Sequence, residues 1–193
     1  MGLKALQCIR DLRIDKVDQK CECEELKSCS SWPEADELWE RAKDSDAMIA
    51  VHNSRLLDAL YPACNERFRR LKVQRDGRVL GWAVVLNSKL NDKQYFGDLR
   101  VGSVIDCLAV PEEEYHVVNA ATGYLESQGV DLIVTHQLHR GWCKSFARNG
   151  YLRGPSNFIF AASPGLAEKL RPFETKQVRV HITRGDGDGP FQL

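Results

Sequence analysis

The chain has 193 residues, 43% of them hydrophobic, so one compact domain with an apolar core is expected. Its 27 Lys and Arg residues balance its 27 Asp and Glu residues, which argues against a nucleic-acid partner because binding a phosphate backbone needs a basic surface. No apolar run approaches the roughly 18 residues of a membrane span, and the opening "MGLKALQC" lacks a signal-peptide apolar region, so we expect a cytoplasmic protein.

The first 60 residues predict a polar segment and then two helices. Residues 1–30 are charged and weakly patterned, and they form either an N-terminal extension or an edge strand. The run Ser31-Trp32-Pro33-Glu34 combines a hydroxyl, an early proline and an acid, which is typical of a helix start. Asn53 is a second N-cap candidate, directly before "SRLLDALY".

The pattern then changes from helical to strand-like. Two β-rich runs flank Asp76-Gly77 in "FRRLKVQRDGRVLGWAVVL", which predicts a hairpin with a tight turn. The segment "NSKLNDKQYFGDLRVG" reads as a polar loop or a ragged strand, and residues 104–110 form the next strand.

The second half alternates between helices and strands. Apolar positions from 112 to 128 follow helical spacing and stop at Gly129, and a second short helix ends at Gly150. Strands are predicted at "VDLIVTHQL", "NFIFAAS" and "KQVRVHIT", followed by a flexible tail over residues 184–193. This order predicts an α/β (α+β) fold, with a mixed, mostly antiparallel sheet and helices on both faces.

The seven cysteines predict free thiols, because their number is odd and the chain has ample core. Cys21, Cys23 and Cys29 are the only cluster in the sequence, with a C-x-C spacing and no fourth ligand nearby. Structural zinc sites usually have four ligands with two to four residues between paired cysteines. We therefore expect no metal.

Three local motifs in this order resemble the GNAT superfamily of N-acetyltransferases. They are the hairpin "RDGRVLGWAVV", the strand end "VIDCLAVPEE" and the helix end "SFARNGY". The resemblance covers about residues 32–163, within a domain we place at 31–183. The ending "HITRGDGDGPFQL" is similar to the second unit of bacterial GNAT-like and FemAB-like proteins linked to polysaccharide or cell-wall biosynthesis. That likeness implies a partner GNAT-like unit, or a homodimer.

The resemblance implies an N-acyltransferase that moves an acyl group from acetyl-CoA or another acyl-CoA to an amine on a small molecule, an amino sugar or a peptide. The pantetheine arm would pair with the strand backbone at Leu108, Ala109 and Val110. Asp106 stands where a general base is often found, although a lone acid in an apolar strand is also explained by structural pairing. His139 takes the position of an Asn that contacts the cofactor arm, and His136 is the substrate-binding candidate. Two loop histidines without such a role are the alternative.

The pyrophosphate loop departs from the family pattern. Glu114, Val117 and Asn119 stand where a Gln or basic residue, a glycine and a small residue are expected. A carboxylate about 4 Å from a phosphate costs about 4 kcal/mol near a protein surface, more than the helix dipole returns. Phe146 also replaces the usual general-acid tyrosine. The alternative is therefore a non-catalytic GNAT-like domain that binds no CoA. A FemAB-type use of aminoacyl-tRNA is a third possibility, which the neutral charge disfavours.

Overall fold

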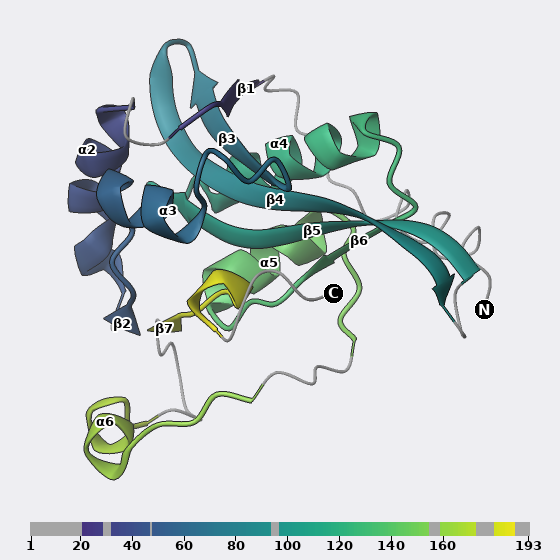
Figure 1. Cartoon of the computed structure of the whole chain (residues 1–193). Coiled ribbons are helices and arrows are strands. Elements are labelled where there is room, and N and C mark those ends of the chain that lie inside the picture. Colours follow the sequence, from purple (N-terminus) through teal and green to yellow (C-terminus); the bar gives the residue numbers. More distant parts are fainter. Residues whose placement is uncertain are drawn as a thin grey trace.

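The computed structural model describes residues 21–28, 32–46, 48–93, 97–154, 159–172 and 180–187. Its centre is a five-stranded sheet in the order β1-β3-β4-β5-β6, in which β5 and β6 are parallel and the other described pairs are antiparallel (Figure 1). The strands are β1 (Glu22–Leu26), β3 (Phe68–Arg75), β4 (Arg78–Lys93), β5 (Gly97–Ala109) and β6 (Leu132–Thr135). A second, small parallel sheet joins β2 (Met48–Ile49) to β7 (Val180–His181). The predicted mixed, mostly antiparallel sheet is confirmed.

Helices cover both faces of the main sheet, as the sequence predicted. The α-helices are α2 (Glu34–Ala42), α3 (Ser54–Leu60), α4 (Glu114–Ser127), α5 (Arg140–Arg148) and α6 (Pro164–Lys169), and the short 3-10 helices are η1 (Lys43–Ser45) and η2 (Arg184–Asp186). One face lies under α2 and α3 and the other under α4 and α5, while α6 lies apart from the sheet (Figure 1).

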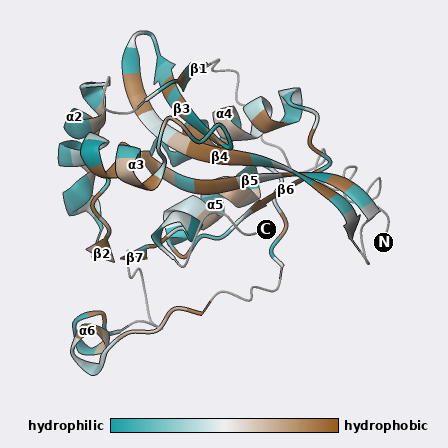
Figure 2. Ribbon diagram, in the orientation of Figure 1, coloured by the Kyte–Doolittle hydropathy of each residue, from teal (hydrophilic) through white to brown (hydrophobic). Residues whose placement is uncertain are grey.

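The two faces have separate apolar cores, because successive strand residues point to opposite sides of a sheet. Along β4, Trp82 and Val84 pack on the α2/α3 side, whereas Ala83 and Val85 pack on the α4/α5 side. β4 and β5 accordingly read as nearly continuous apolar runs at the centre of the molecule (Figure 2). Buried on both faces, these two strands hold the sheet between the helix layers.

Several local signals in the sequence are confirmed. Asp76 and Gly77 both have positive φ, at 51° and 74°, as a tight hairpin turn requires. The Asn53 side chain accepts a hydrogen bond from Leu56 N at 2.9 Å and so caps α3. Gly129 and Gly150 follow α4 and α5 with φ of 69° and 84°, the left-handed conformation that ends helices.

Other predictions need correction. Of the two alternatives for residues 87–102, a polar loop or a ragged strand, the described residues form the strand: β4 continues to Lys93, β5 begins at Gly97, and their pairing shifts register after Leu90. The predicted strand "NFIFAAS" is absent over residues 159–163, and its first two residues lie outside the described part. The tail expected to be flexible starts instead with the buried turn η2, because Arg184 and Gly185 pack against the sheet. Within residues 1–30, where an extension or an edge strand was expected, β1 lies at the edge of the sheet.

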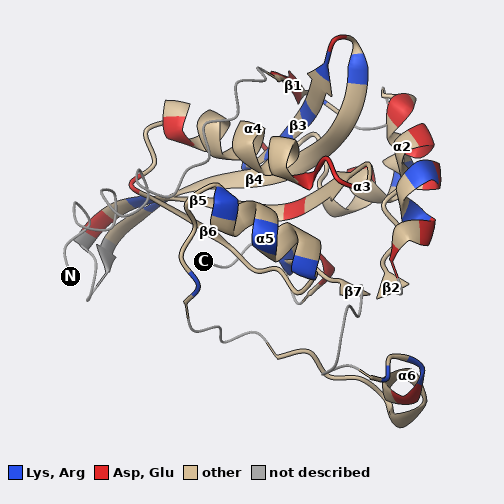
Figure 3. Ribbon diagram, turned by 180° about the vertical axis from the view of Figure 1, so that it is seen from behind, with Lys and Arg blue, Asp and Glu red and all other residues tan. Residues whose placement is uncertain are grey.

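Figure 3 marks the charged residues on the ribbon, and α2 and α5 carry several of them. On α5, Arg140, Lys144 and Arg148 are exposed, while Trp142 and Phe146 are buried. Among the described helices, none has the length and apolarity needed to cross a bilayer. Some ionisable side chains are nevertheless buried, and among the described residues these include His52, Asp106 and Arg184.

Candidate functional site

A bulge in β5 decides which way Asp106 points. Val84 pairs with Asp106 and Val85 pairs with Val104, so Ile105 is an extra residue opposite β4. A bulge of this kind interrupts the alternation of side chains between faces. Ile105 belongs to the core under α2 and α3, and the contacts of Asp106 lie on that side too. The carboxylate is thereby kept out of the apolar core under α4 and α5.

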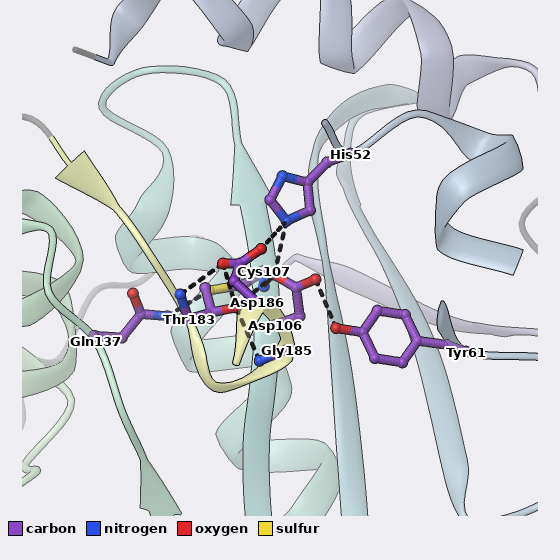
Figure 4. Close-up of polar contacts among 8 residues, drawn as sticks. All are labelled: His52, Tyr61, Asp106, Cys107, Gln137, Thr183, Gly185 and Asp186. Carbon is purple, nitrogen blue, oxygen red and sulfur yellow. Dashed lines mark hydrogen bonds and ion pairs between the residues drawn. The ribbon is translucent and has the colours of Figure 1, made fainter. Parts of the chain in front are cut away.

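Asp106 is fully buried and has partners for both oxygens (Figure 4). Tyr61 Oη donates to Oδ2 at 2.8 Å, and the Cys107 backbone N–H donates to Oδ1 at 2.8 Å. Thr183 Oγ1 donates to Oδ1 at 3.1 Å, and His52 Nε2 lies 3.2 Å from the same oxygen. Burial alone would raise the Asp106 pKa, but the His52 charge and the hydrogen bonds from His52 and Tyr61 outweigh it and lower the pKa.

His52 stands between two carboxylates. Its Nε2 is 3.2 Å from Asp106 Oδ1 and 3.7 Å from Asp186 Oδ1, and the ring is completely buried. Burial lowers the His52 pKa, but the two acids raise it further, to about 9. Burial and the neighbouring Asp106 raise the Asp186 pKa. In the absence of other ions His52 is therefore protonated at neutral pH and links the two acids.

Asp186 and Thr183 belong to the C-terminal segment, defined here as residues 180–187. Thr183 forms a capping box with Asp186: the Thr183 backbone N–H donates to Asp186 Oδ2 at 2.8 Å, and Thr183 Oγ1 accepts from Gly185 N at 3.2 Å. Gly185 is packed so closely that an added Cβ would overlap the Tyr61 hydroxyl and lie 3.2 Å from Asp106. The sequence "TRGD" thus forms a tight turn that packs against Tyr61 and Asp106.

The C-terminal segment lies at the point where β5 and β6 separate. Their pairing ends at Val104 and Thr135, and two residues later Gln137 forms an antiparallel bridge with Thr183. Leu138 N also donates to Ile182 O at 3.4 Å. Figure 1 shows this segment, in yellow, beside the ends of β6 and α5. The chain's own end therefore fills the space beyond the last β5–β6 pair.

His181 forms the outer wall of the same cluster. Its ring is fully buried, stacks on Trp142 at 5.7 Å, and lies 5.8 Å from the His52 ring and 6.2 Å from the His139 ring. Burial lowers the His181 pKa to about 3, an effect that Asp106 only partly opposes, so the ring is neutral. Among the described residues, neither ring nitrogen has a hydrogen-bond partner.

The structure separates the predicted histidines from Asp106. His139 caps α5, with Nδ1 accepting from Trp142 N at 3.4 Å, and its Nε2 lies 3.3 Å from Asp46 Oδ1. His136 is partly buried in the loop after β6, and burial followed by the charge of Arg184 lowers its pKa. Both histidines therefore line the outside of the cluster and lie outside the set of groups bonded to Asp106.

The predicted cofactor-binding residues, Leu108, Ala109 and Val110, lie at or directly after the C-terminal end of β5. Leu108 and Val110 point into the core under α2 and α3, and Ala109 points into the core under α4 and α5. The Val110 N–H donates back to Leu80 O at 2.8 Å. All three side chains are buried, so any role in binding would use backbone atoms.

The start of α4 has its own carboxylate where the resemblance implies a phosphate. Burial raises the Glu114 pKa, although backbone N–H groups of Glu114 and Glu112 donate to this carboxylate and partly offset the rise. Glu113 instead pairs with Arg75, with an oxygen–nitrogen distance of 3.2 Å. Val117 is fully buried, against Gly81.

Asn119 and Cys21 each contact a side chain from another part of the chain. Asn119 Nδ2 donates to Asn149 Oδ1 at 3.1 Å, which ties α4 to the end of α5. Cys21 Sγ lies 3.6 Å from His116 Nδ1, whereas Cys29 falls outside the described residues. The expectation that the cysteine cluster binds no metal therefore stays a prediction, about residues that are only partly described.

Sequence reasoning missed His52, Tyr61, Thr183, His181 and Asp186. The signal for Asp106 was available, because an isolated acid in an apolar strand must find a partner. His52 precedes a helix cap, and Asp186 lies in a Gly/Asp-rich run that is typical of a flexible turn, so neither pattern indicated burial.

No protein-family model matches the sequence, and no curated protein matches it. Solved structures do match. A GNAT family acetyltransferase from Staphylococcus aureus aligns with TM-score 0.52 at 10% identity, over 75% of this chain and 100% of its own. A GCN5-related N-acetyltransferase from Ralstonia eutropha aligns with TM-score 0.50 at 15% identity, over 75% and 99%.

The chain has a GNAT-like fold. A ribosomal-protein-alanine N-acetyltransferase from Brucella melitensis gives the same result, with TM-score 0.50 at 12% identity over 75% of this chain and 100% of that one. Identities this low establish the fold alone. The fold that the sequence motifs predicted is therefore confirmed.

Proposed function

We propose that this chain is a GNAT-like domain that does not turn over acyl-CoA in the conformation described, because its own C-terminal segment occupies the donor space. The resemblance implies that the pantetheine arm lies where the two parallel strands separate, against residues 108–110. In this chain Thr183 bridges to Gln137 at that separation and donates to Asp106. This placement of Thr183 is the observation that carries the proposal.

The start of α4 supports the same conclusion. A pyrophosphate at a helix N-terminus needs free backbone N–H groups and a close approach of the backbone. Here the Glu114 carboxylate already accepts from backbone N–H groups, and the buried side chain of Val117 stands at the position of a glycine. A bound pyrophosphate would have to displace one carboxylate and lie next to two more.

Asp106 is also engaged in a way that disfavours general-base chemistry. A base must reach the proton of the acceptor amine, directly or through one water. Asp106 is completely buried, and Tyr61, Cys107, Thr183 and His52 already contact its two oxygens. The domain is accordingly proposed to act as a non-catalytic unit.

A second candidate function is an acyl-CoA N-acyltransferase that the C-terminal segment keeps closed. One observation favours it: the segment is held by polar contacts, Thr183 with Asp106 and Asp186 with His52, and displacing them would open the gap and free the Asp106 carboxylate. In this candidate Asp106 is the base and an amine is the acceptor.

Titration with acetyl-CoA separates the two candidates. Isothermal calorimetry and thermal shift would compare the wild-type chain with Gly185→Ala, whose Cβ would overlap the Tyr61 hydroxyl and push out the turn. Gly165→Ala is the matched control, because that Cβ would meet no atom within 4 Å. We expect no shift in melting temperature for any of the three proteins at about 1 mM acetyl-CoA.

Each alternative result is informative. Binding to the wild-type chain at micromolar concentration would overturn the non-catalytic proposal. Binding to Gly185→Ala but to neither wild type nor Gly165→Ala would instead support the closed acyltransferase. Thiol release with an amine acceptor would then be measured on the Gly185→Ala protein.

A further inference from the structure

Three buried ligand-type atoms meet under α3 from three distant parts of the chain. They are His52 Nε2 before α3, Asp106 Oδ1 from the β5 bulge and Asp186 Oδ1 from η2, and all lie within 4.8 Å of one another. Figure 4 shows the imidazole directed at both carboxylates. His52 and Asp106 are completely buried, and the Asp186 side chain is 9% exposed.

Their spacing suits a small divalent ion. Zinc bonds to histidine nitrogen and carboxylate oxygen are about 2.0–2.2 Å long, so tetrahedral neighbours lie about 3.3–3.6 Å apart. The distances from His52 Nε2 to the two oxygens are 3.2 Å and 3.7 Å, on either side of that range. The two nitrogen–oxygen distances therefore need to change by only a few tenths of an ångström, and the two carboxylate oxygens lie within 4.8 Å of each other.

The charges also suit a divalent ion. Asp106 and Asp186 bring two negative charges into a largely buried site, and an unpaired buried charge is costly. A divalent cation with a neutral imidazole balances both carboxylates, whereas the His52 proton balances only one of them. Imidazole and carboxylate are common ligands of zinc and of other first-row metals.

Outer hydrogen bonds hold each ligand in place, as around many metal sites. Tyr61 orients the Asp106 carboxylate through its other oxygen, Oδ2, and the Thr183 backbone N–H orients Asp186 in the same way. Oδ1 of Asp106 also accepts from the Cys107 backbone N–H and the Thr183 hydroxyl, and a bound ion would share this oxygen with them. The His52 ring is packed between the rings of Trp39 and Trp82, whose centroids lie 6.1 Å and 5.6 Å away. The atoms facing the centre of the trio therefore belong to side chains that are fixed from outside.

His181 is a second, independent indication of a ligand. It is fully buried, its ring lies 5.8 Å from the His52 ring, and neither nitrogen has a hydrogen-bond partner among the described residues. Leaving both nitrogens of a buried imidazole unsatisfied is unfavourable. Rotation of this ring toward the trio would supply a fourth ligand.

We propose that His52, Asp106 and Asp186 bind one divalent transition-metal ion of the zinc type, with His181 as the fourth ligand. The ion would join the C-terminal segment to the β5 bulge and to the loop before α3. This site departs from the sequence-based expectation of no metal, which was drawn from the spacing of the cysteines.

Metal titration of the full chain tests the site. The chelator-stripped protein would be titrated with Zn²⁺ by calorimetry and with Co²⁺ by visible absorption, in wild type, His52→Gln and Asp186→Asn. His116→Gln is the control, because His116 lies beside the Cys21 thiol and is not a member of the proposed ligand set. We expect one equivalent in wild type and His116→Gln, and at least a tenfold weaker affinity in the other two.

Spectra and folding controls make the result decisive. Co²⁺ on nitrogen and oxygen ligands gives tetrahedral visible bands without the strong near-ultraviolet band of a cobalt–thiolate bond. A wild-type chain with native circular dichroism that binds neither ion below about 100 µM would overturn the proposal, whatever the variants do. Equal affinity in wild type and a folded His52→Gln would overturn it too.

Discussion

The two faces of the central sheet are built on different principles. Under α4 and α5 the core is apolar. Every second side chain of β4 and one face of α4 point into it, as the sequence pattern predicts. Under α2 and α3 the apolar core surrounds a charged cluster of His52, Asp106 and Asp186. The same strand, β5, therefore contributes to an apolar core that the sequence pattern predicts and, on its other side, to a polar site whose residues are far apart in the sequence.

The largest effect is expected from a substitution in the polar face, the side of the sheet that carries His52, Asp106 and Asp186. Asp106→Ala should lower the free energy of unfolding by about 3–5 kcal/mol, because it leaves His52, Tyr61 and Thr183 buried without their partner. Urea denaturation followed by circular dichroism measures the loss. The control Glu37→Ala removes an exposed acid of α2 and should change stability by less than about 0.5 kcal/mol. Equal losses would mean that the cluster contributes nothing.

The apolar face should respond to volume instead of charge. Gly81→Ala should lower the free energy of unfolding by about 1–3 kcal/mol, because its Cβ would meet Leu108 O and Val117. Gly123→Ala, in α4 with open space around it, should raise that free energy by about 0.5–1 kcal/mol. Thermal unfolding of the pair measures both signs, and a destabilised Gly123→Ala would count against the close approach as the cause.

Helix caps test how far the polar face depends on local structure. Asn53→Ala removes the cap of α3 next to His52 and should lower the free energy of unfolding by about 1 kcal/mol. Ser163→Ala removes the analogous cap of α6, which buries no residue, and should change global stability by less than about 0.5 kcal/mol. If both variants lose the same amount in urea denaturation, α3 has no special link to the sheet.

The smallest effect concerns the buried acid at the start of α4. Because the folded-state pKa of Glu114 lies above its ordinary 4.5, the proton binds the folded state more tightly. Its contribution is therefore favourable at low pH and is lost as the pH rises through the folded pKa. Relative to wild type, Glu114→Gln should gain stability between pH 4 and pH 7 in urea titrations. A difference that does not change with pH would contradict the raised pKa.

Local patterns allowed much of the fold to be predicted. The Asp76-Gly77 turn, the Asn53 cap and the glycines that end α4 and α5 each rest on interactions within a few residues. Such signals are visible in sequence because the backbone conformations they require favour particular residues.

The candidate site was predicted only in part, for a physical reason. Asp106 stood out as an acid in an apolar strand, but its partners Tyr61 and Thr183 are 45 and 77 positions away. His139 was predicted as functional from its place after a strand, yet in the structure it caps α5 and pairs with Asp46. Pairings over such distances depend on how the whole chain packs.

The sequence by itself determined the hairpin turn, the helix caps and the central strands and helices, because these follow from periodicity and from backbone preferences of single residues. The tertiary structure decided that Ile105 bulges, so that Asp106 turns toward α3. It also decided that the "RGD" turn is buried against Asp106 when its composition indicated a flexible tail. Burial of a charge is stable only where distant partners surround it, and only the folded chain brings those partners together.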